Sequence, residues 1–439
     1  MVSLGCPKNL VDSEVMLASL EQSGYTVVDE AEQASVVLIN TCGFIRPAVE
    51  EAIDAILELA AGKQLNPSQF LVVTGCMVQR YGKELVAELP EVDLFVGLDD
   101  FPRIGQLLDN RTPGQLVIAT PGAATYLMDS TVERRISTPF FRSYLKITEG
   151  CDNRCAYCMI PAIRGRLRSR EILDLTREAI RLEQSGVREL SLIAQDLTAY
   201  GRDLTPAVDL TVLLESLLNK SAIPWFRLLY AYPTGVTDKL LQLMAEQPRL
   251  LPYLDIPFQH VSDRVLHRMN RHYTRATLDD LIGRIRTYVP DCAIRTTMLV
   301  GFPGENEEDV MHLVDALQTW ELDHVGVFQY QDEEGSAAAG LPHKVSEEEK
   351  EARYRAVMEA QAAISERRQQ RFVGRVEPVL IEGLSRESDL LLEGRTRFQA
   401  PEIDGCVYIT SGEVNPGDIV SVQITEVHTY DLVGEVIEG

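Results

Sequence analysis

The chain has 439 residues, of which 45% are apolar, and a formal net charge of −24 at pH 7. Its length is enough for about two to four domains, and no run approaches the roughly 18 apolar residues of a membrane span. These features predict a soluble globular protein and exclude a membrane protein. The strong negative charge favours a basic partner over nucleic acid.

The eight cysteines indicate metal binding. Nothing at the N-terminus has the pattern of a signal peptide, so we expect a cytoplasmic protein whose thiols stay reduced. In such a protein, cysteines serve metal sites more often than disulfides.

The first part of the chain, residues 1–130, predicts a parallel α/β domain, because short apolar runs alternate with amphipathic stretches. The predicted strands are residues 2–4, 36–40 and 70–74, and the predicted helices are 10–22, with Asp12 or Ser13 near its start, and 47–60.

Cysteines follow all three of these strands. Cys6, Cys42 and Cys76 each come one or two residues after a predicted strand. Because the carboxyl ends of parallel strands share one edge of the sheet, the three side chains can converge. Each could be a buried small hydrophobic residue. Three similar placements favour ligands of an iron–sulfur cluster that has one iron left open.

After a less regular stretch at 99–138, residues 131–371 predict a second α/β domain. Strand-like runs alternate with helical ones, which indicates a parallel sheet with its functional groups at the carboxyl ends of the strands. A capping box of Ser346 and Glu349 begins a helix expected to reach about Arg371. The strand-like runs are 141–147, 187–193, 225–230, 253–256, 293–300 and 324–330.

A second group of cysteines follows the first of these runs. Cys151, Cys155 and Cys158 have the spacing Cys-x3-Cys-x2-Cys within one loop. Three thiolates leave one corner of a four-iron cluster open to a small molecule. A structural zinc site with a distant fourth ligand, or free thiols, are the alternatives.

Other polar residues lie at the predicted strand ends. They are candidates for cofactor or substrate contacts, although each could be a cap or turn residue. Arg295, inside the fifth run, could pair with a carboxylate. The basic run at 164–170 is by default a solvated face, and it could alternatively offset cluster charge or bind an acidic target. The strand-end residues are Gln195, Asp196, Tyr232, Gln259, His260 and Glu305.

Residues 372–439 predict a small β-barrel, because short β-rich runs are broken by Gly and Pro. This part has four arginines against thirteen Asp and Glu, a net charge of −9. A barrel that binds a phosphate backbone needs the opposite sign, so an acidic barrel favours a basic protein as partner.

The loop 149–161 resembles the cysteine loop of the radical S-adenosylmethionine (SAM) superfamily, with Tyr157 as the aromatic residue before the last cysteine. The segments 3–13, 40–45 and 75–77 resemble the N-terminal domain of methylthiotransferases, which insert sulfur and a methyl group into a C–H bond. The C-terminal region resembles their TRAM domain. Residues 255–260 are similar to those of members that modify an aspartate of ribosomal protein S-twelve.

The resemblance implies an α/β fold with an N-terminal cluster domain, a partial (β/α)6-type barrel and a TRAM barrel. It implies two [4Fe-4S] clusters, one held by Cys151, Cys155 and Cys158 and one by Cys6, Cys42 and Cys76. Tyr157, Gln195, Asp196 and Arg295 would contact SAM. The implied partners are ribosomal protein S-twelve and a low-potential electron donor such as flavodoxin or ferredoxin, without direct nucleic-acid binding. A tRNA methylthiotransferase is the alternative enzyme, and a zinc or nucleic-acid-binding module is the alternative class.

Overall fold

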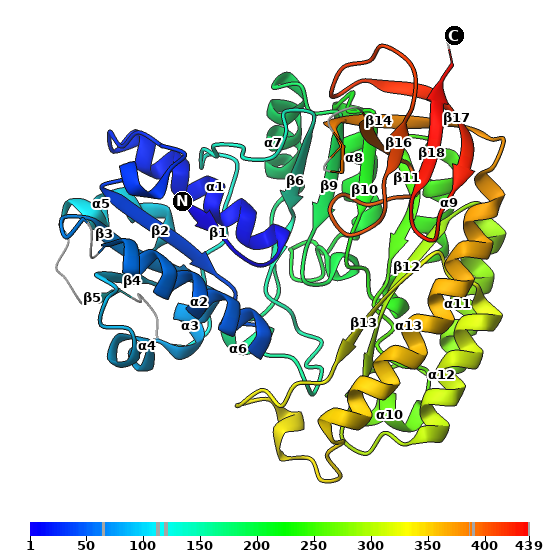
Figure 1. The fold of residues 1–439 in the computed structure, drawn as a ribbon, viewed down its shortest axis with the longest axis horizontal. Helices are drawn as coiled ribbons and strands as arrows, with labels where there is room; N and C mark the ends of the chain where they lie inside the picture. The colour runs from blue at the N-terminus through cyan, green and yellow to red at the C-terminus, as the bar shows by residue number, and fades with distance from the viewer. Residues whose placement is uncertain (64–65, 111–114, 118–121, 386, 389–390, 438–439) are drawn as a thin grey trace.

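The computed structural model describes residues 1–63, 66–110, 115–117, 122–385, 387–388 and 391–437. They form an N-terminal α/β unit, a central α/β unit and a C-terminal barrel (Figure 1). This arrangement confirms the predicted fold class. No helix in the described ranges is long and apolar enough to cross a membrane.

The N-terminal unit is a five-stranded parallel sheet, in which β2 and β3 are buried nearly throughout, as their apolar runs predict. The order is β1 (Val2–Ser3), β2 (Val36–Thr41), β3 (Phe70–Gly75), β4 (Leu94–Val96) and β5 (Gln115–Val117). The helices are α1 (Pro7–Gln22), α2 (Arg46–Lys63), α3 (Cys76–Tyr81), α4 (Lys83–Glu88) and α5 (Ile104–Asp109).

The structure corrects the predicted start of helix α1. It begins at Pro7, with Cys6 as its N-cap, three residues before the predicted start. Proline suits the first helical position because its missing N–H would have no partner there. Asp12 and Ser13 therefore lie inside the helix, where both are buried.

The stretch at 99–138, predicted to be less regular, differs in part: it contains helix α5 and strand β5, and β5 extends the first sheet. Residues 111–114 and 118–121 of this stretch lie outside the described ranges. The boundary at residue 130 stays a prediction.

The central unit has the six parallel strands that the sequence predicts. Their order is β6 (Arg142–Lys146), β9 (Glu189–Ile193), β10 (Trp225–Leu228), β11 (Leu250–Asp255), β12 (Ala293–Val300) and β13 (His324–Gln329). The helices are α6 (Ile160–Ile163), α7 (Ile172–Gln184), α8 (Leu210–Lys220), α9 (Asp238–Glu246), α10 (Asp263–Arg268), α11 (Arg275–Tyr288) and α12 (Glu307–Trp320).

Helix α13 (Glu347–Gln369) leads to the C-terminal barrel. The predicted capping box is confirmed, because the Ser346 hydroxyl accepts from the Glu349 N–H at 3.3 Å and the Glu349 carboxylate accepts from the Ser346 N–H at 3.1 Å. The closed barrel has the order β14 (Val376–Leu384), β15 (Leu392–Thr396), β16 (Val407–Ile409), β18 (Leu432–Val436) and β17 (Ile419–Val427).

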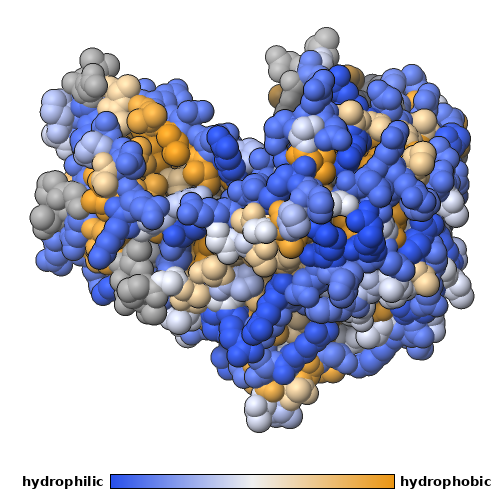
Figure 2. All heavy atoms as spheres, turned by 90° about the horizontal axis from the view of Figure 1, so that it is seen from below, coloured by the Kyte–Doolittle hydropathy of each residue, from blue (hydrophilic) through white to orange (hydrophobic). Residues whose placement is uncertain are grey.

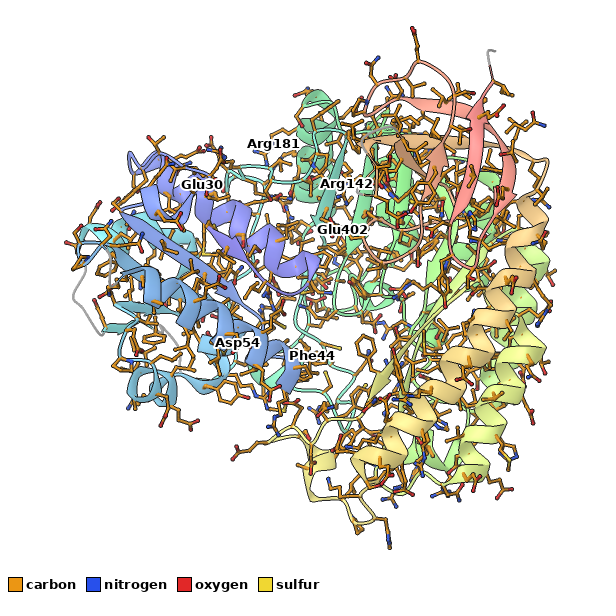
Figure 3. The ribbon with its side chains drawn as sticks, viewed as in Figure 1. Glu30, Phe44, Asp54, Arg142, Arg181 and Glu402 are labelled. Atoms are coloured by element: carbon orange, nitrogen blue, oxygen red, sulfur yellow. The ribbon has the colours of Figure 1, made fainter. Side chains whose placement is uncertain are left out.

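Ion pairs join the barrel to the central unit. The buried Glu189 carboxylate of β9 accepts from Arg227 of β10 at 2.6 Å and from Arg395 of β15 at 2.5 Å. Arg142 and Glu402 lie side by side at the same junction, 2.9 Å apart (Figure 3).

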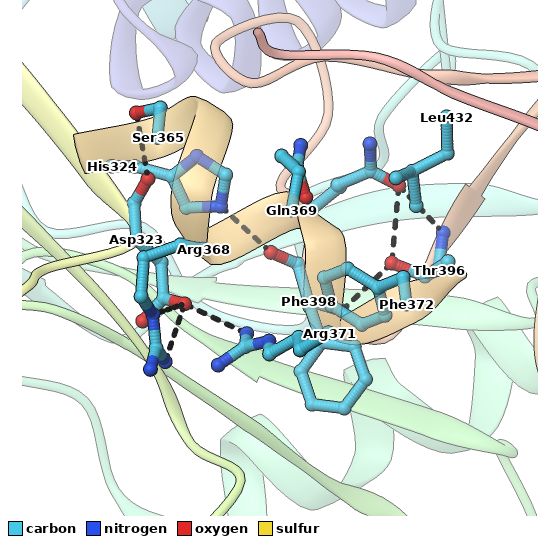
Figure 4. A pocket seen from close by; sticks show the side chains of 11 residues that line it. Asp323, His324, Ser365, Arg368, Gln369, Arg371, Phe372, Thr396, Phe398 and Leu432 are labelled. Atoms are coloured by element: carbon cyan, nitrogen blue, oxygen red, sulfur yellow. Dashed lines mark hydrogen bonds and ion pairs between the residues drawn. The ribbon is translucent and has the colours of Figure 1, made fainter. Parts of the chain in front are cut away.

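A second junction lies where α13 meets the barrel, around a small pocket (Figure 4). Asp323 accepts there from Arg368 and Arg371 at 3.0 and 2.7 Å. His324 bonds the Phe398 carbonyl at 3.0 Å. The polar contacts of Asp323 and His324 thus fix the barrel against the central sheet.

Seen from below, a notch separates the N-terminal unit from the rest of the molecule (Figure 2).

Candidate active site

The loop with Cys151, Cys155 and Cys158 follows β6. Its base is closed by β7 (Thr148–Glu149), which pairs antiparallel with β8 (Arg168–Ser169). Gly150 is required at the first turn, because its φ is +73° and a Cβ there would lie 2.0 Å from the Arg166 carbonyl oxygen.

The three thiols of this loop lie close enough to affect one another. Burial, and then the neighbouring thiols, raise the pKa of Cys158 well above its ordinary value. Burial raises the pKa of Cys151 to about 11, so its thiol is protonated at neutral pH. The Arg271 guanidinium donates to Cys155 Sγ at 3.4 Å, and the Asn153 N–H donates to Cys151 Sγ at 3.5 Å. Such donors suit thiolate ligands of a metal cluster.

Two predicted residues at the end of β9 support this loop. Asp196 accepts from the Asn153 side chain at 2.7 Å and caps a short 3-10 helix through the Thr198 N–H at 3.0 Å. Gln195 donates to Glu149 at 3.4 Å, and its buried Oε1 has no hydrogen-bond partner within the described ranges. That oxygen is free to accept from a bound molecule.

Tyr157 has an aromatic neighbour: its ring meets the Phe302 ring edge-to-face, with centroids 6.5 Å apart. This contact joins the cysteine loop to the segment after β12. The Tyr157 ring therefore packs against the segment that follows the carboxyl end of β12.

The second cysteine group forms at the carboxyl ends of β1, β2 and β3. Cys42 follows β2 directly, Cys76 is the first residue of α3, and Cys6 lies three residues after β1. Glycines allow the turns to approach: a Cβ on Gly5 would lie 2.8 Å from Cys42 Cβ, and one on Gly43 would lie 2.6 Å from Met77 N. The predicted convergence of the three strand ends is therefore present.

Burial and neighbouring thiols also dominate this group. Burial, and then Cys76, raise the pKa of Cys42 to about 12. Asn9 fastens the turns, because its amide donates to the Leu4 and Thr41 carbonyls at 3.2 and 3.0 Å. The triad thus sits in a rigid, hydrogen-bonded frame.

A buried polar network connects the two cysteine groups. Arg164, at the C-cap of α6, donates to Cys76 Sγ at 3.3 Å and to Asp12 at 2.8 Å. It also donates to Glu149, next to the other triad, at 3.0 and 3.1 Å. Lys146 pairs with both Asp12 and Glu149. Burial alone would raise the pKa of Glu149, but Lys146 and Arg164 outweigh it and lower the pKa to about 2.

The structure corrects the default interpretation of the basic run at residues 164–170, which was that all of it is a solvated face. Arg166 is exposed, as a solvated face requires, but Arg164 and Arg170 are 3% and 2% exposed and make buried ion pairs. Sequence reasoning did not assign Arg164 because the exposed and buried arginines share one run. The contacts that give Arg164 a role form only where the N-terminal and central domains meet, and the sequence does not show that junction.

Lys8 was also not assigned. It is 9% exposed, its ammonium group donates to the Ala194 carbonyl at 3.3 Å, and it lies 3.6 Å from the centre of the Tyr230 ring. It makes no ion pair with any residue that the structure describes. Lys8 is two residues from Cys6, so its amino group lies beside the second triad, and burial lowers the pKa of that group.

Arg295 lies on β12 and pairs with protein carboxylates. Its guanidinium contacts Asp255 at 3.1 Å and Asp404 of the barrel at 3.5 Å. Burial alone would lower the pKa of this guanidinium, but Asp255 and the other negative neighbours outweigh it and raise the pKa. The predicted pairing with a carboxylate is present, but the partners are side chains of this chain.

Comparison with known proteins identifies the fold and the family. Family models match the three units: "Uncharacterized protein family UPF0004" at residues 1–97, the radical SAM superfamily at 145–317 and the TRAM domain at 373–437. A radical SAM methyltransferase, TsrM from Kitasatospora setae, has a TM-score of 0.54 at 16% identity, covering 74% of this chain and 70% of its own. That likeness concerns the fold.

Full-length relatives decide the family. Ribosomal protein uS12 methylthiotransferase RimO of Desulfotalea psychrophila is 52% identical over 437 residues, 100% of this chain and 98% of the relative. RimO of Geobacter sulfurreducens is 47% identical, with the same coverage. The chain belongs to the RimO family. As a RimO-family member it is a radical SAM methylthiotransferase, a transferase whose cofactors are SAM and iron–sulfur clusters.

Proposed function

We propose that this enzyme adds a methylthio group to the β-carbon of an aspartate in ribosomal protein uS12, the S-twelve of the predictions, and uses two [4Fe-4S] clusters. One observation carries the proposal: two cysteine triads from two domains meet across one buried network, with Arg164 bonded to Cys76 Sγ at 3.3 Å. Two cluster sites joined by one buried network suit a transfer of sulfur to a carbon radical.

Cys151, Cys155 and Cys158 would hold the cluster to which SAM binds. When bound, that cluster supplies the electron that splits SAM and yields a deoxyadenosyl radical able to remove hydrogen from the substrate. Gln195 would accept from SAM through its free oxygen, Asp196 would keep the loop in place through Asn153, and Tyr157 would line the site. Arg295 would contact SAM only by leaving Asp255 and Asp404, so we propose that it mainly joins barrel and core.

Cys6, Cys42 and Cys76 would hold the second cluster, which would carry the sulfur to be transferred. The chain's own residues fix these ligands: Asn9 ties the turns together, and Arg164 donates to Cys76.

Lys8 would recognise the substrate. The target aspartate brings a carboxylate, which would favour the charged form of the Lys8 amino group, buried beside Cys6 without an ion-pair partner among the described residues. A charge-assisted bond to the substrate carboxylate would hold the β-carbon near the second triad.

The charge of the C-terminal barrel supports a protein substrate. Exposed acidic residues on it outnumber exposed basic ones, which suits a basic ribosomal protein met in the cytoplasm and disfavours a tRNA backbone. The exposed acids of the described part are Glu387, Glu402, Glu413, Asp418, Glu426 and Glu435, against Arg375 and His428.

A low-potential protein such as flavodoxin or ferredoxin would supply the electron that the cluster of the first triad needs to split SAM.

The experiment compares both substrate classes. Reconstituted, reduced enzyme and SAM are incubated with uS12, with uS12 whose target aspartate is changed to asparagine, and with tRNA, and each product is weighed by mass spectrometry. We expect a methylthio increment on uS12 alone. An increment on tRNA and none on uS12 would contradict the proposal and favour the tRNA enzyme.

A further inference from the structure

Arg164 has an unusually complete set of contacts. A guanidinium has five N–H donors. Nε donates to Cys76 Sγ at 3.3 Å, Nη1 to the two Glu149 oxygens at 3.1 and 3.0 Å, and Nη2 to Asn9 Oδ1 and Asp12 Oδ2 at 2.7 and 2.8 Å. Every donor therefore has an acceptor, and the side chain has one orientation.

The partners of Arg164 belong to both cluster sites. Arg164 follows Cys158 by six residues, and Glu149 precedes Cys151 by two, so both belong to the loop of the first triad. Asn9, Asp12 and Cys76 belong to the N-terminal domain. With 3% of its surface exposed, Arg164 acts without screening by solvent.

We infer that Arg164 is a positioning residue that sets the reduction potential of the cluster held by Cys6, Cys42 and Cys76. The inference rests on the proposed function, because it requires a cluster at that triad. An N–H···S bond and a buried positive charge both stabilise the more negative, reduced state, so they raise the potential. Because Glu149 orients the same guanidinium, the loop of the first cluster helps to tune the second.

Arg166 offers a matched control. It lies two residues away in the same loop, its side chain is 81% exposed, and it pairs with Asp152 at 3.2 Å. Its loss removes the same charge from the loop without removing any bond to Cys76.

The test uses the full chain with Cys151, Cys155 and Cys158 changed to Ala, so that only the second cluster can load. Iron content and the midpoint potential, followed by electron paramagnetic resonance, are measured for Arg164, Arg164→Gln and Arg166→Gln. We expect Arg164→Gln to shift the reduction equilibrium at least tenfold toward the oxidised cluster, about 59 mV for one electron, and Arg166→Gln to leave it unchanged. An unchanged potential in Arg164→Gln at full iron content would overturn the inference.

A second measurement does not depend on the stability of Arg164→Gln. With 15N-labelled arginine in the triple-Ala background, the reduced cluster should show a nitrogen coupling that is lost in Arg164→Lys. No coupling with native Arg164 would also overturn the inference. The absence of iron from the triple-Ala chain with native Arg164 would instead contradict the proposed second cluster itself.

Discussion

Small residues determine whether the N-terminal cysteines can form one site. Gly43 lies where the turn after β2 passes the start of α3, and its missing side chain leaves room for the Met77 backbone. Nothing flexible lies there to move aside, because the nearest atoms are main-chain atoms of Cys76 and Met77. The geometry of the second triad therefore depends on a residue that binds no metal.

We expect Gly43→Ala to lower iron binding at the second triad alone, because its Cβ would come within 2.6 Å of Met77 N and push Cys42 away from Cys76. Iron content after reconstitution should fall from about eight to about four per chain. Gly62→Ala is the control, since nothing lies within 4 Å of a Cβ at that position. Full iron in Gly43→Ala would show that the turns are not as constrained as the distances indicate.

The role of Lys8 can be tested by its coupling to the substrate. Native enzyme should bind uS12 at least about tenfold more tightly than uS12 with asparagine at the target position, a difference of about 1.4 kcal/mol. Lys8→Met should bind both forms equally, and Lys8→Arg should recover part of the difference. Persistent discrimination in Lys8→Met, measured by titration calorimetry, would assign the carboxylate contact elsewhere.

At this scale the sequence predicted the six candidate ligands but not their polar partners. Cysteine spacing and placement after strands are local signals, so both triads could be predicted. Arg164 and Lys8 gain their roles only from contacts with another domain, to Cys76 and to Ala194. In a run of arginines, the sequence does not show which side chains are buried and which are exposed to solvent.

At the scale of elements, the junction between β9 and the C-terminal barrel is an ion-pair network in which the buried Glu189 binds Arg227 and Arg395, and Arg395 also binds Glu382. Burial on its own would raise the pKa of Glu189, but Arg395 and Arg227 outweigh it and lower the pKa to about 2. A carboxylate whose folded pKa lies below its ordinary value stabilises the fold at pH values above that ordinary value. The stabilisation is lost as the pH falls from about 4.5 toward about 2.

Glu189→Gln should therefore lower the free energy of unfolding at pH 7 by about 3–5 kcal/mol, since it leaves the buried Arg227 without its carboxylate and Arg395 with Glu382 alone. It should also flatten the dependence of stability on pH below about 4.5, measured by denaturant unfolding of the cluster-free chain. Glu402→Gln, at a partly exposed pair with Arg142, should cost less than about 1 kcal/mol. Equal effects of the two variants would refute the stated importance of the buried pair.

Elements with strong periodicity were predicted well, and several short ones were missed. The six central strands, the capped helix α13 and the barrel follow from apolar runs, a capping box and broken β segments. Strands β4 and β5 have three residues each, too few for a periodic signal, and the start of α1 was missed because Pro7 was not taken as a helix start.

At the scale of the whole molecule, the two cluster domains meet through buried charges as well as apolar contacts, since one apolar cluster includes Val15 of α1 and Tyr144 and Ile163 of the central unit. Besides the network around Arg164, the buried Arg134 pairs with Glu14 of α1 at 2.6 Å and also with Glu178 of α7. Arg80 of α3 pairs with Glu333, beyond β13, at 2.8 Å. Polar interfaces of this kind fix one relative orientation, because each buried charge must find its partner.

The central claim is that one chain holds two separate iron sites, and iron and sulfide analysis after anaerobic reconstitution tests it most directly. We predict about eight irons per chain for the native protein, and about four each for the variant lacking Cys6, Cys42 and Cys76 and the variant lacking Cys151, Cys155 and Cys158. About four irons in the native chain, or bound zinc in place of iron, would contradict it.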